Sequence, residues 1–198
     1  MTFAPARRQL LLPIIVLGVS LALLAGAVWV TLAPHDPGSP APSAIGGSFH
    51  LVDQDGRNVT QDDFKGQPVL VFFGFTHCPD VCPTTLFEIS EVMRKLGSDK
   101  KVRGLFVTVD PERDTPELMK SYLSSFDKRI AGLTGERQAV DEMLKAYRVY
   151  SRKVPIEGDN YTMDHSAIIY LMDKQMRFVN ALPLQDPDRA IKEIQRWM

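Results

Sequence analysis

Cysteine and excess charge are scarce in this sequence. Only two cysteines occur in 198 residues, Cys78 and Cys82, and neither lies near the N-terminus, which excludes attachment through a lipidated N-terminal cysteine. Arg7 and Arg8 are the only charges before residue 33, so the 23 basic and 24 acidic residues become 21 and 24 beyond it, a net charge of −3. Nucleic acid is therefore not an expected partner, because proteins that bind it concentrate positive charge. Internal repeats are also lacking, and the residues after 32 suffice for one sizeable core but not for two.

The longest apolar run, Leu10 to Leu32, has 23 residues without a charge. As an α-helix it would be roughly 35 Å long, enough to cross the hydrocarbon core of a bilayer. Arg7 and Arg8 precede the run, so the positive-inside rule places the N-terminus in the cytoplasm. We predict a cytoplasmic N-terminus at 1–9, a transmembrane anchor at 10–32 and a domain on the far side of the membrane.

A cleaved signal peptide is the alternative for this segment, since Leu24–Ala27 resembles a small-residue cleavage site. The apolar run exceeds the about 7–15 residues of a signal peptide, which favours an uncleaved anchor. The flank before it is too short for an organelle transit peptide. We therefore predict a bacterial plasma (inner) membrane protein, single-pass, with its C-terminal domain on the periplasmic or extracytoplasmic side.

Proline is concentrated between residues 33 and 48, where APHDPGSPAPSAIGGS offers almost nothing to bury. Pro-rich segments favour extended conformations at about 3.1 Å per residue, so this stretch spans up to roughly 50 Å. We predict a tether at 33–48, of a length that suits a protein reaching another membrane protein. A passive spacer is the alternative.

The remainder, residues 49–198, has the pattern of one α/β domain. A continuous β-branched and aromatic run at Val69–Phe73 is typical of a central strand covered on both faces. Apolar residues then recur at helical spacing up to Gly97, and 102–109 is the next strand, which implies a right-handed parallel crossover. The other predicted elements are a hairpin at 49–52 and 57–59, a helical turn at 60–64, helices at 116–126, 138–147 and 187–197, a loop at 154–163, and a second hairpin at 167–172 and 177–180. This order predicts an α/β sandwich with a mixed sheet.

The loop after the second central strand is rich in charge. Thr115 or Asp114 is expected to cap the helix that begins at Pro116. Asp110, Arg113 and Asp114 are expected to be turn and cap residues, with a surface for partner docking as the alternative for all three.

The motif with the clearest chemical potential is FGFTHCPDVCP at 73–83, at the carboxyl end of the central strand and the start of the first helix. Open α/β sheets bind ligands at that end. A helix N-terminus stabilises negative charge, so both Cys78 and Cys82 are expected to be activated as thiolates. Their i, i+4 spacing puts the Cα atoms about 6 Å apart in a helix, which permits either a disulfide or convergence on one soft cation.

A plain stabilising disulfide is the simplest alternative use of these two cysteines outside the cytoplasm. A bridge that closes so small a loop removes little entropy from the unfolded chain, so a redox or metal role is favoured. CxxxC also differs from the CxxC of thioredoxin-type oxidoreductases, because one extra residue loosens the geometry that sets their reduction potential.

Two thiolates form a better site for a thiophilic metal if an imidazole joins them. His165 is the candidate, since it stands just before the strand that begins at Ala167 and after a predicted loop. A structural or surface role is the alternative for an isolated histidine. His77 is adjacent to Cys78 but points elsewhere if the strand continues, and Met163 is a minor candidate for an axial ligand.

Several segments together resemble the Sco/SenC family. They are the motif at 73–83, VDPERDTP at 109–116, LTG at 133–135 and DHS at 164–166. The resemblance extends from about Gly47 to the C-terminus, plus the anchor, and it implies a thioredoxin-like fold. It also implies a copper-binding protein that helps assemble the dinuclear copper centre of cytochrome c oxidase. One departure is the turn at 173–176, which lacks the glycine expected there.

The resemblance places Cys78, Cys82 and His165 at the family's ligand positions. Two thiolates and one imidazole suit three-coordinate Cu(I) and can also hold Cu(II), whereas zinc would need a fourth ligand. The implied roles are thiolate ligands for the two cysteines, which also form the candidate redox-active disulfide, and a third ligand for His165. Asp164 is a candidate for orienting the imidazole.

Together with the apolar run, the resemblance implies a membrane-anchored copper chaperone rather than an enzyme, with a thiol-disulfide oxidoreductase or redox sensor as the alternative. The expected partners are the copper-bearing subunit of cytochrome c oxidase, a periplasmic copper donor and the membrane. A peroxidase-like thiol enzyme is a weaker candidate, because its cysteine follows Thr-x-x-Cys, whereas one residue separates Thr76 from Cys78. His165 separates the first two functions, since dithiol exchange needs no distant imidazole.

Overall fold

The computed structural model describes residues 6–32, 44–158 and 160–198, and the chain divides into two units, 1–39 and 40–198. In the first unit α1 (Ala6–Leu32) is a helix of 27 residues, and the large apolar side chains that are described in it are exposed. No helix among the described residues combines the length and hydropathy of a bilayer-spanning segment. The transmembrane anchor at 10–32 therefore stays a prediction. Residues 33–43 of the predicted tether lie outside the described residues.

The second unit is built on a seven-stranded mixed sheet in the order β2-β1-β5-β4-β3-β8-β9. The strands are β1 (His50–Asp53), β2 (Asn58–Thr60), β3 (Val69–Gly74), β4 (Arg103–Thr108), β5 (Ile130–Thr134), β8 (Ile169–Met172) and β9 (Phe178–Ala181). The three central strands β3, β4 and β5 are parallel, and the hairpins β1-β2 and β8-β9 join them antiparallel. The predicted mixed sheet with an extra N-terminal hairpin is thereby confirmed.

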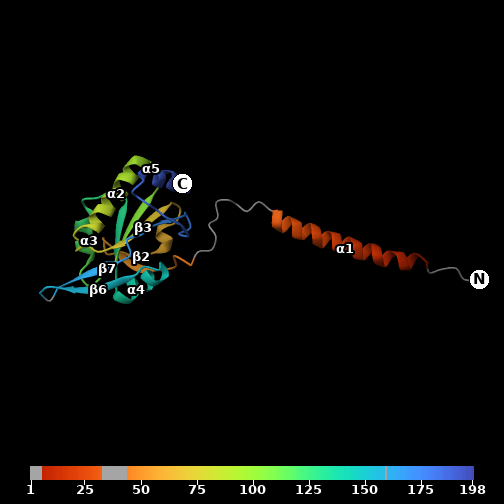
Figure 1. Cartoon of the computed structure of the whole chain (residues 1–198), viewed down its shortest axis with the longest axis horizontal. Coiled ribbons are helices and arrows are strands. Elements are labelled where there is room, and N and C mark those ends of the chain that lie inside the picture. Colours follow the sequence, from red (N-terminus) through yellow and green to blue (C-terminus); the bar gives the residue numbers. More distant parts are fainter. Residues whose placement is uncertain (1–5, 33–43, 159) are drawn as a thin grey trace, which may run out of the picture. The chain divides into compact units, whose positions relative to one another are not determined.

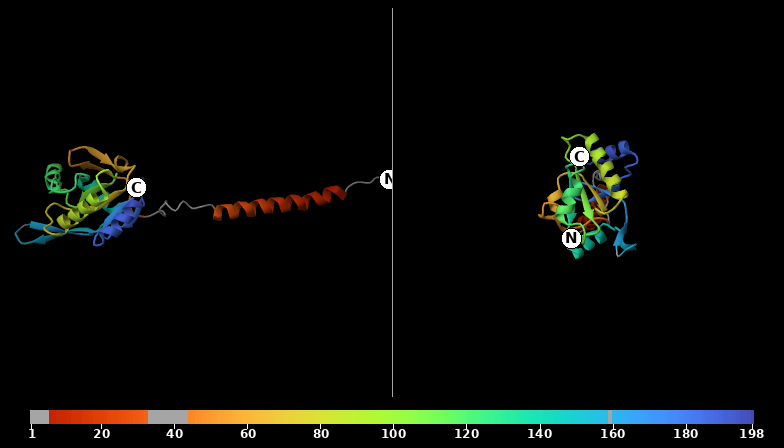
Figure 2. Two further views of the ribbon diagram at one scale, coloured as in Figure 1. Left: turned by 90° about the horizontal axis from the view of Figure 1, so that it is seen from above. Right: turned by 90° about the vertical axis from the view of Figure 1, so that its left-hand side faces the viewer.

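Helices cover both faces of this sheet. They are α2 (Val81–Leu96), α3 (Pro116–Leu123), α4 (Arg137–Ala146) and α5 (Pro187–Gln195), with a short 3-10 helix at Gln61–Phe64. On one face Phe72 and Phe106 pack in a row with Tyr122 of α3. On the other, Phe73 packs against Tyr147, which directly follows α4. Helices α2 and α5 lie side by side (Figures 1 and 2).

Local sequence explains where these elements begin and end. Every residue of β3 is buried, as expected of a strand covered on both faces. Thr115 caps α3 by accepting the backbone N–H of Leu118, and Pro116 is its first residue. The turn without glycine is closed by Asp173, and Met176 takes the left-handed conformation there, with φ 62°.

Two parts of the predicted order were wrong. The first is β5, which the sequence pattern did not predict, because Ala131 and Gly132 interrupt its β-branched residues. The second is 154–163, which is not a loop: β6 (Ser151–Ile156) and β7 (Asn160–His165) form an antiparallel pair. This pair is largely exposed and polar, so it lacks the alternation that predicts strands. Helices α3 and α5 also end slightly earlier than predicted, at Leu123 and Gln195.

Candidate metal centre

The two cysteines lie where β3 passes into α2. Cys78 is in the connecting turn, and Cys82 is the second residue of the helix. Asp80 occupies the N-cap position but makes no side-chain capping bond. Instead the backbone N–H of Cys82 donates to the sulfur of Cys78, with N and Sγ 3.4 Å apart. The Cys78 sulfur therefore serves one of the unpaired N–H groups at the helix N-terminus.

The Cys82 thiol has a different environment. It is fully buried, and burial raises the pKa of this thiol well above its ordinary value, which a hydrogen bond from the backbone of Phe75 only partly offsets. The expectation that the helix N-terminus activates both thiols is therefore wrong for Cys82, because desolvation outweighs the favourable helix end. Cys82 stays protonated at neutral pH until a metal displaces its proton.

Gly74, the last residue of β3, makes room for this sulfur. A Cβ at this position would lie 2.8 Å from the Cys82 sulfur and 2.6 Å from a ring carbon of Phe106. Both neighbours are fully buried and have little space to move. The absence of a side chain at Gly74 thus lets Cys82 pack directly on the end of the strand.

His165 ends β7 and faces the same sulfur. Its Nε2 lies 3.7 Å from Sγ of Cys82, although 83 residues separate the two in the sequence. Its Nδ1 lies 3.1 Å from the carbonyl oxygen of Ser166. A carbonyl only accepts, so Nδ1 carries the proton and the lone pair of Nε2 points toward Cys82. This is the arrangement typical of metal-binding histidines, whose second nitrogen donates to a carbonyl or carboxylate.

Burial also acts on this imidazole. It lowers the pKa of His165, an effect that the hydrogen bond to Ser166 opposes, so the ring is neutral at neutral pH. The ring packs edge-on against Phe75, with centroids 5.8 Å apart. A neutral, oriented imidazole is a ready ligand, because no proton has to leave before it binds a metal.

Asp114 holds the turn that contains Cys78 through hydrogen bonds. Its carboxylate accepts hydrogen bonds from the hydroxyl and backbone N–H of Thr76 and from the hydroxyl of Thr108, the two hydroxyl contacts being 2.6 Å each. Burial raises the pKa of Asp114, and these hydrogen bonds oppose that rise. The backbone carbonyl of Asp110 accepts the turn hydrogen bonds of Arg113 and Asp114, as predicted for this turn. The side chains of Asp110 and Asp114 are fully buried, so the alternative of a docking surface is wrong for these two residues.

Cys78, Cys82 and His165 are donors that suit a soft metal ion, although the three side chains do not yet converge on a single position. Both cysteines are free thiols, and among residues 6–32, 44–158 and 160–198 no three His, Cys, Asp or Glu side chains already form a metal-binding cluster. The structure brings Cys82 and His165 together and keeps Cys78 next to the Cys82 backbone. Two sulfurs and one nitrogen fit the preference of Cu(I) for soft donors and low coordination number.

Comparison with known proteins decides the family. The model of the SCO1/SenC family matches residues 37–198, most of the chain. The chain belongs to the SCO1/SenC family. A SCO2-like protein of Rickettsia felis is 34% identical over 191 residues, which cover 90% of this chain and 93% of that protein.

Solved SCO1/SenC structures share the fold. The copper-bound structure of Bradyrhizobium japonicum ScoI is 53% identical, covers 78% of this chain and 99% of its own, and superposes with a TM-score of 0.75. Copper-bound yeast Sco1 is 36% identical over 79% of this chain and 91% of its own, with a TM-score of 0.71. The predicted thioredoxin-like α/β fold of the SCO1/SenC family is thereby confirmed, and these relatives hold copper.

The other residues of this SCO1/SenC chain that the sequence offered as ligands or orienting groups lie in different surroundings from Cys78, Cys82 and His165. His77 is exposed and contacts the hydroxyl of Thr76, as expected of a residue that points away from the thiols. Met163 is buried in the hydrophobic core. Asp164 is exposed and lies 3.9 Å from Arg152, so the main-chain carbonyl of Ser166, not Asp164, orients the imidazole. Sequence patterns do not reveal a carbonyl acceptor of this kind.

Proposed function

We propose that this SCO1/SenC protein is a copper chaperone that holds copper through Cys78, Cys82 and His165. It would deliver the metal during assembly of the dinuclear copper centre of cytochrome c oxidase. The observation that carries the proposal is the approach of the His165 Nε2 lone pair to within 3.7 Å of the Cys82 sulfur. A dithiol used for redox exchange alone has no need of this imidazole.

The chemistry follows from the protonation states of the three donors. His165 is neutral and offers its lone pair directly, whereas Cys82 must lose a proton to become a thiolate ligand. Cu(I) is the expected ion, since two thiolates and an imidazole satisfy it without a fourth ligand, and Cu(II) can use the same donors. Exchange of thiolate ligands between two proteins then transfers the ion without oxidation or reduction.

A thiol-disulfide oxidoreductase acting on a partner is the second candidate. The observation in its favour is the difference in exposure of the two free thiols: Cys78 is partly exposed and Cys82 is fully buried behind it. Such a pair suits an accessible attacking thiol and a protected resolving thiol. Both functions use the same cysteines, so His165 is the residue that separates them.

We also propose that residues 10–32 anchor the protein in the bacterial plasma membrane, with residues 49–198 on the periplasmic or extracytoplasmic side. Support comes from the uncharged 23-residue run, the arginines before it and the exposed apolar side chains of α1. The partners would then be the copper-bearing oxidase subunit and a periplasmic copper donor. Recovery of a shortened chain in the soluble fraction after cell lysis would contradict the anchor.

Cells that lack this protein should assemble cytochrome c oxidase with a depleted dinuclear copper centre, because no chaperone supplies the ion. The copper content of the purified oxidase is the measurement. The wild-type gene should restore it, and a gene carrying Cys78→Ser should not, since one thiolate ligand is lost. Normal copper content in the oxidase from cells without the protein would contradict the proposed function.

A further inference from the structure

The hairpin that carries His165 is not part of the main sheet. Strands β6 and β7 pair only with each other, and most of their side chains are at least partly exposed. An isolated two-stranded hairpin is marginally stable in water. The position of His165 relative to the cysteines therefore depends on the contacts that dock this hairpin onto the domain.

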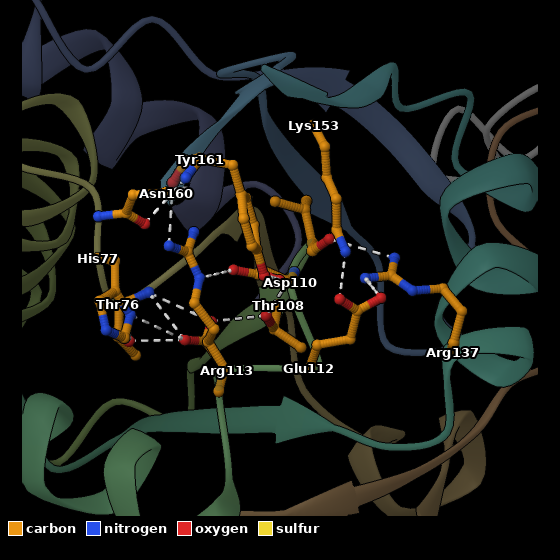
Figure 3. A network of polar contacts seen from close by, with 12 residues as sticks. Thr76, His77, Thr108, Asp110, Glu112, Arg113, Arg137, Lys153, Asn160 and Tyr161 are labelled. Carbon is orange, nitrogen blue, oxygen red and sulfur yellow. Dashed lines mark hydrogen bonds and ion pairs between the residues drawn. The ribbon is translucent and has the colours of Figure 1, made fainter. Parts of the chain in front are cut away.

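Arg113, from the turn between β4 and α3, makes several of these contacts (Figure 3). Its Nε donates to the carboxylate of Asp110, and its Nη1 donates to the carbonyl oxygen of Tyr161 in β7 at 3.0 Å. The guanidinium also lies over the Tyr161 ring, 3.8 Å from the centroid. Opposite Tyr161 in the hairpin is Pro155, which has no backbone N–H to donate.

Tyr161 adds a hydrogen bond from the hairpin to Asp110. Its hydroxyl donates to the second carboxylate oxygen of Asp110 at 2.9 Å. Burial and the neighbouring carboxylate raise the pKa of Tyr161 to about 12, so the hydroxyl keeps the proton that it donates. Asp110, Arg113 and Tyr161 thus form a closed triangle, which we call the latch, between the hairpin and the turn.

The latch is shielded from water. The Asp110 side chain is fully buried, and that of Arg113 is 20% exposed. Charge-assisted hydrogen bonds and cation–π contacts are stronger in such surroundings than at an exposed surface. A second link between hairpin and turn, the ion pair of Lys153 with Glu112, is about half exposed and is expected to contribute little.

The same turn also holds the cysteines. Asp114, the neighbour of Arg113, binds Thr76 two residues before Cys78. One short segment therefore contacts both parts of the proposed metal centre. Arg113 contacts the hairpin that carries His165, and Asp114 contacts the turn that carries Cys78. Hydrogen bonds from one segment to both sides of the site favour a fixed distance between the donors, which are 83 residues apart in the sequence and 3.7 Å apart in the structure.

We propose that Arg113, with Asp110 and Tyr161, is a positioning residue that docks the β6-β7 hairpin and so sets His165 against the Cys82 thiol for copper binding. This inference rests on the proposed copper site, but the latch itself can be measured without copper. Loss of the latch frees the hairpin, lets the imidazole move away from the sulfur and weakens the hold on copper.

The test replaces Arg113 by lysine in the full-length protein. Arg113→Lys keeps the charge but cannot donate to Asp110 and Tyr161 at the same time. Arg129→Lys is the matched control, because Arg129 is 21% exposed and likewise bonds a carboxylate, Asp127, and a backbone carbonyl, that of Gly97. Arg129 precedes β5, at the end of the parallel strands away from the cysteines. Tyr161→Phe is the milder second variant, since it removes only the hydroxyl.

Two readouts are compared, amide hydrogen exchange without metal and Cu(I) affinity by competition with a chelator. Arg113→Lys should speed exchange of the β6 and β7 amides about tenfold, the size expected for one charge-assisted hydrogen bond, and leave α2 unchanged. Copper affinity should fall by about the same factor. Tyr161→Phe should act in the same direction and more weakly, and Arg129→Lys should change neither quantity.

Unchanged exchange in the hairpin of both Arg113→Lys and Tyr161→Phe would overturn the latch, and so would equal acceleration by Arg129→Lys. The two proposals fail separately. If the wild-type protein bound no copper but Arg113→Lys alone freed the hairpin, docking by the latch would stand and the copper function would fall. If copper bound normally to Arg113→Lys with a freed hairpin, the positioning of His165 by Arg113 would be refuted and the copper function would stand.

Discussion

His165→Ala should weaken copper retention by at least about 100-fold, because loss of a direct ligand exceeds the 10–100-fold typical of outer contacts. The same variant should still cycle between dithiol and disulfide, since that exchange needs only Cys78 and Cys82. The measurements are Cu(I) competition with a chelator and thiol titration after oxidation and reduction. In cells the variant should fail to support oxidase assembly.

His77→Ala is the matched control for this experiment. It removes an imidazole adjacent to Cys78 that is half exposed and faces Thr76. Copper retention and oxidase assembly should fall far less than in His165→Ala, because His77 contacts Thr76 and Asp114 rather than a cysteine sulfur. If His165→Ala instead supported full assembly with normal copper in the oxidase, a reductase acting through Cys78 and Cys82 would be the better account.

Copper affinity should rise about tenfold per pH unit for each proton that binding displaces, roughly 100-fold or more between about pH 6 and about pH 8. The sign follows from the opposite shifts that burial causes in the pKa of Cys82 and of His165. The pKa of Cys82 is raised, so its thiol is protonated throughout this range and must release a proton to bind copper. The pKa of His165 is lowered, so the imidazole is already neutral near neutral pH and adds no such dependence there.

Calorimetry in two buffers of different ionisation enthalpy counts these protons directly. The wild-type protein should release at least one proton per Cu(I), and Cys82→Ser should release one fewer. Binding without any proton release would mean that Cys82 does not enter as a thiolate, which would contradict the proposed ligand set.

Local patterns were enough to predict the centre of the fold. The apolar run of β3, the helical spacing after Cys82 and the Thr115-Pro116 start of α3 each depend on neighbours in the sequence, and all three are confirmed. Strand β5 was not predicted because tertiary packing determines its composition. A Cβ on Gly132 would lie 2.8 Å from a methyl of Leu123, so helix α3 requires the small residue that hides the strand.

The site was predicted only in part, for a related reason. Cys78 and Cys82 form a local motif, and the resemblance to the family singled out His165. No local sequence pattern indicates that Asp110 and Asp114 are buried, since a charged residue after a strand is usually a solvated turn residue. Their partners Thr76 and Tyr161 lie 38 and 51 residues away in the sequence, beyond any periodic pattern.

The raised pKa of Cys82 was missed because two opposing effects meet at one sulfur. The helix N-terminus favours the thiolate, and full burial disfavours it. Sequence position reveals the first effect, whereas the second depends on packing, including the bare backbone of Gly74 against which the sulfur lies. The tertiary structure therefore decides that Cys82 is a protonated thiol until a metal arrives.

The copper content of the reduced and oxidised protein tests the central claim most directly. After incubation with Cu(I) and removal of unbound metal, the reduced full-length protein should retain about one copper, because both sulfurs are available as thiolates. The protein with Cys78 and Cys82 joined in a disulfide should retain none, since a disulfide offers no thiolate to the metal. Equal copper retention by the two forms would contradict a site built on these two cysteines and His165.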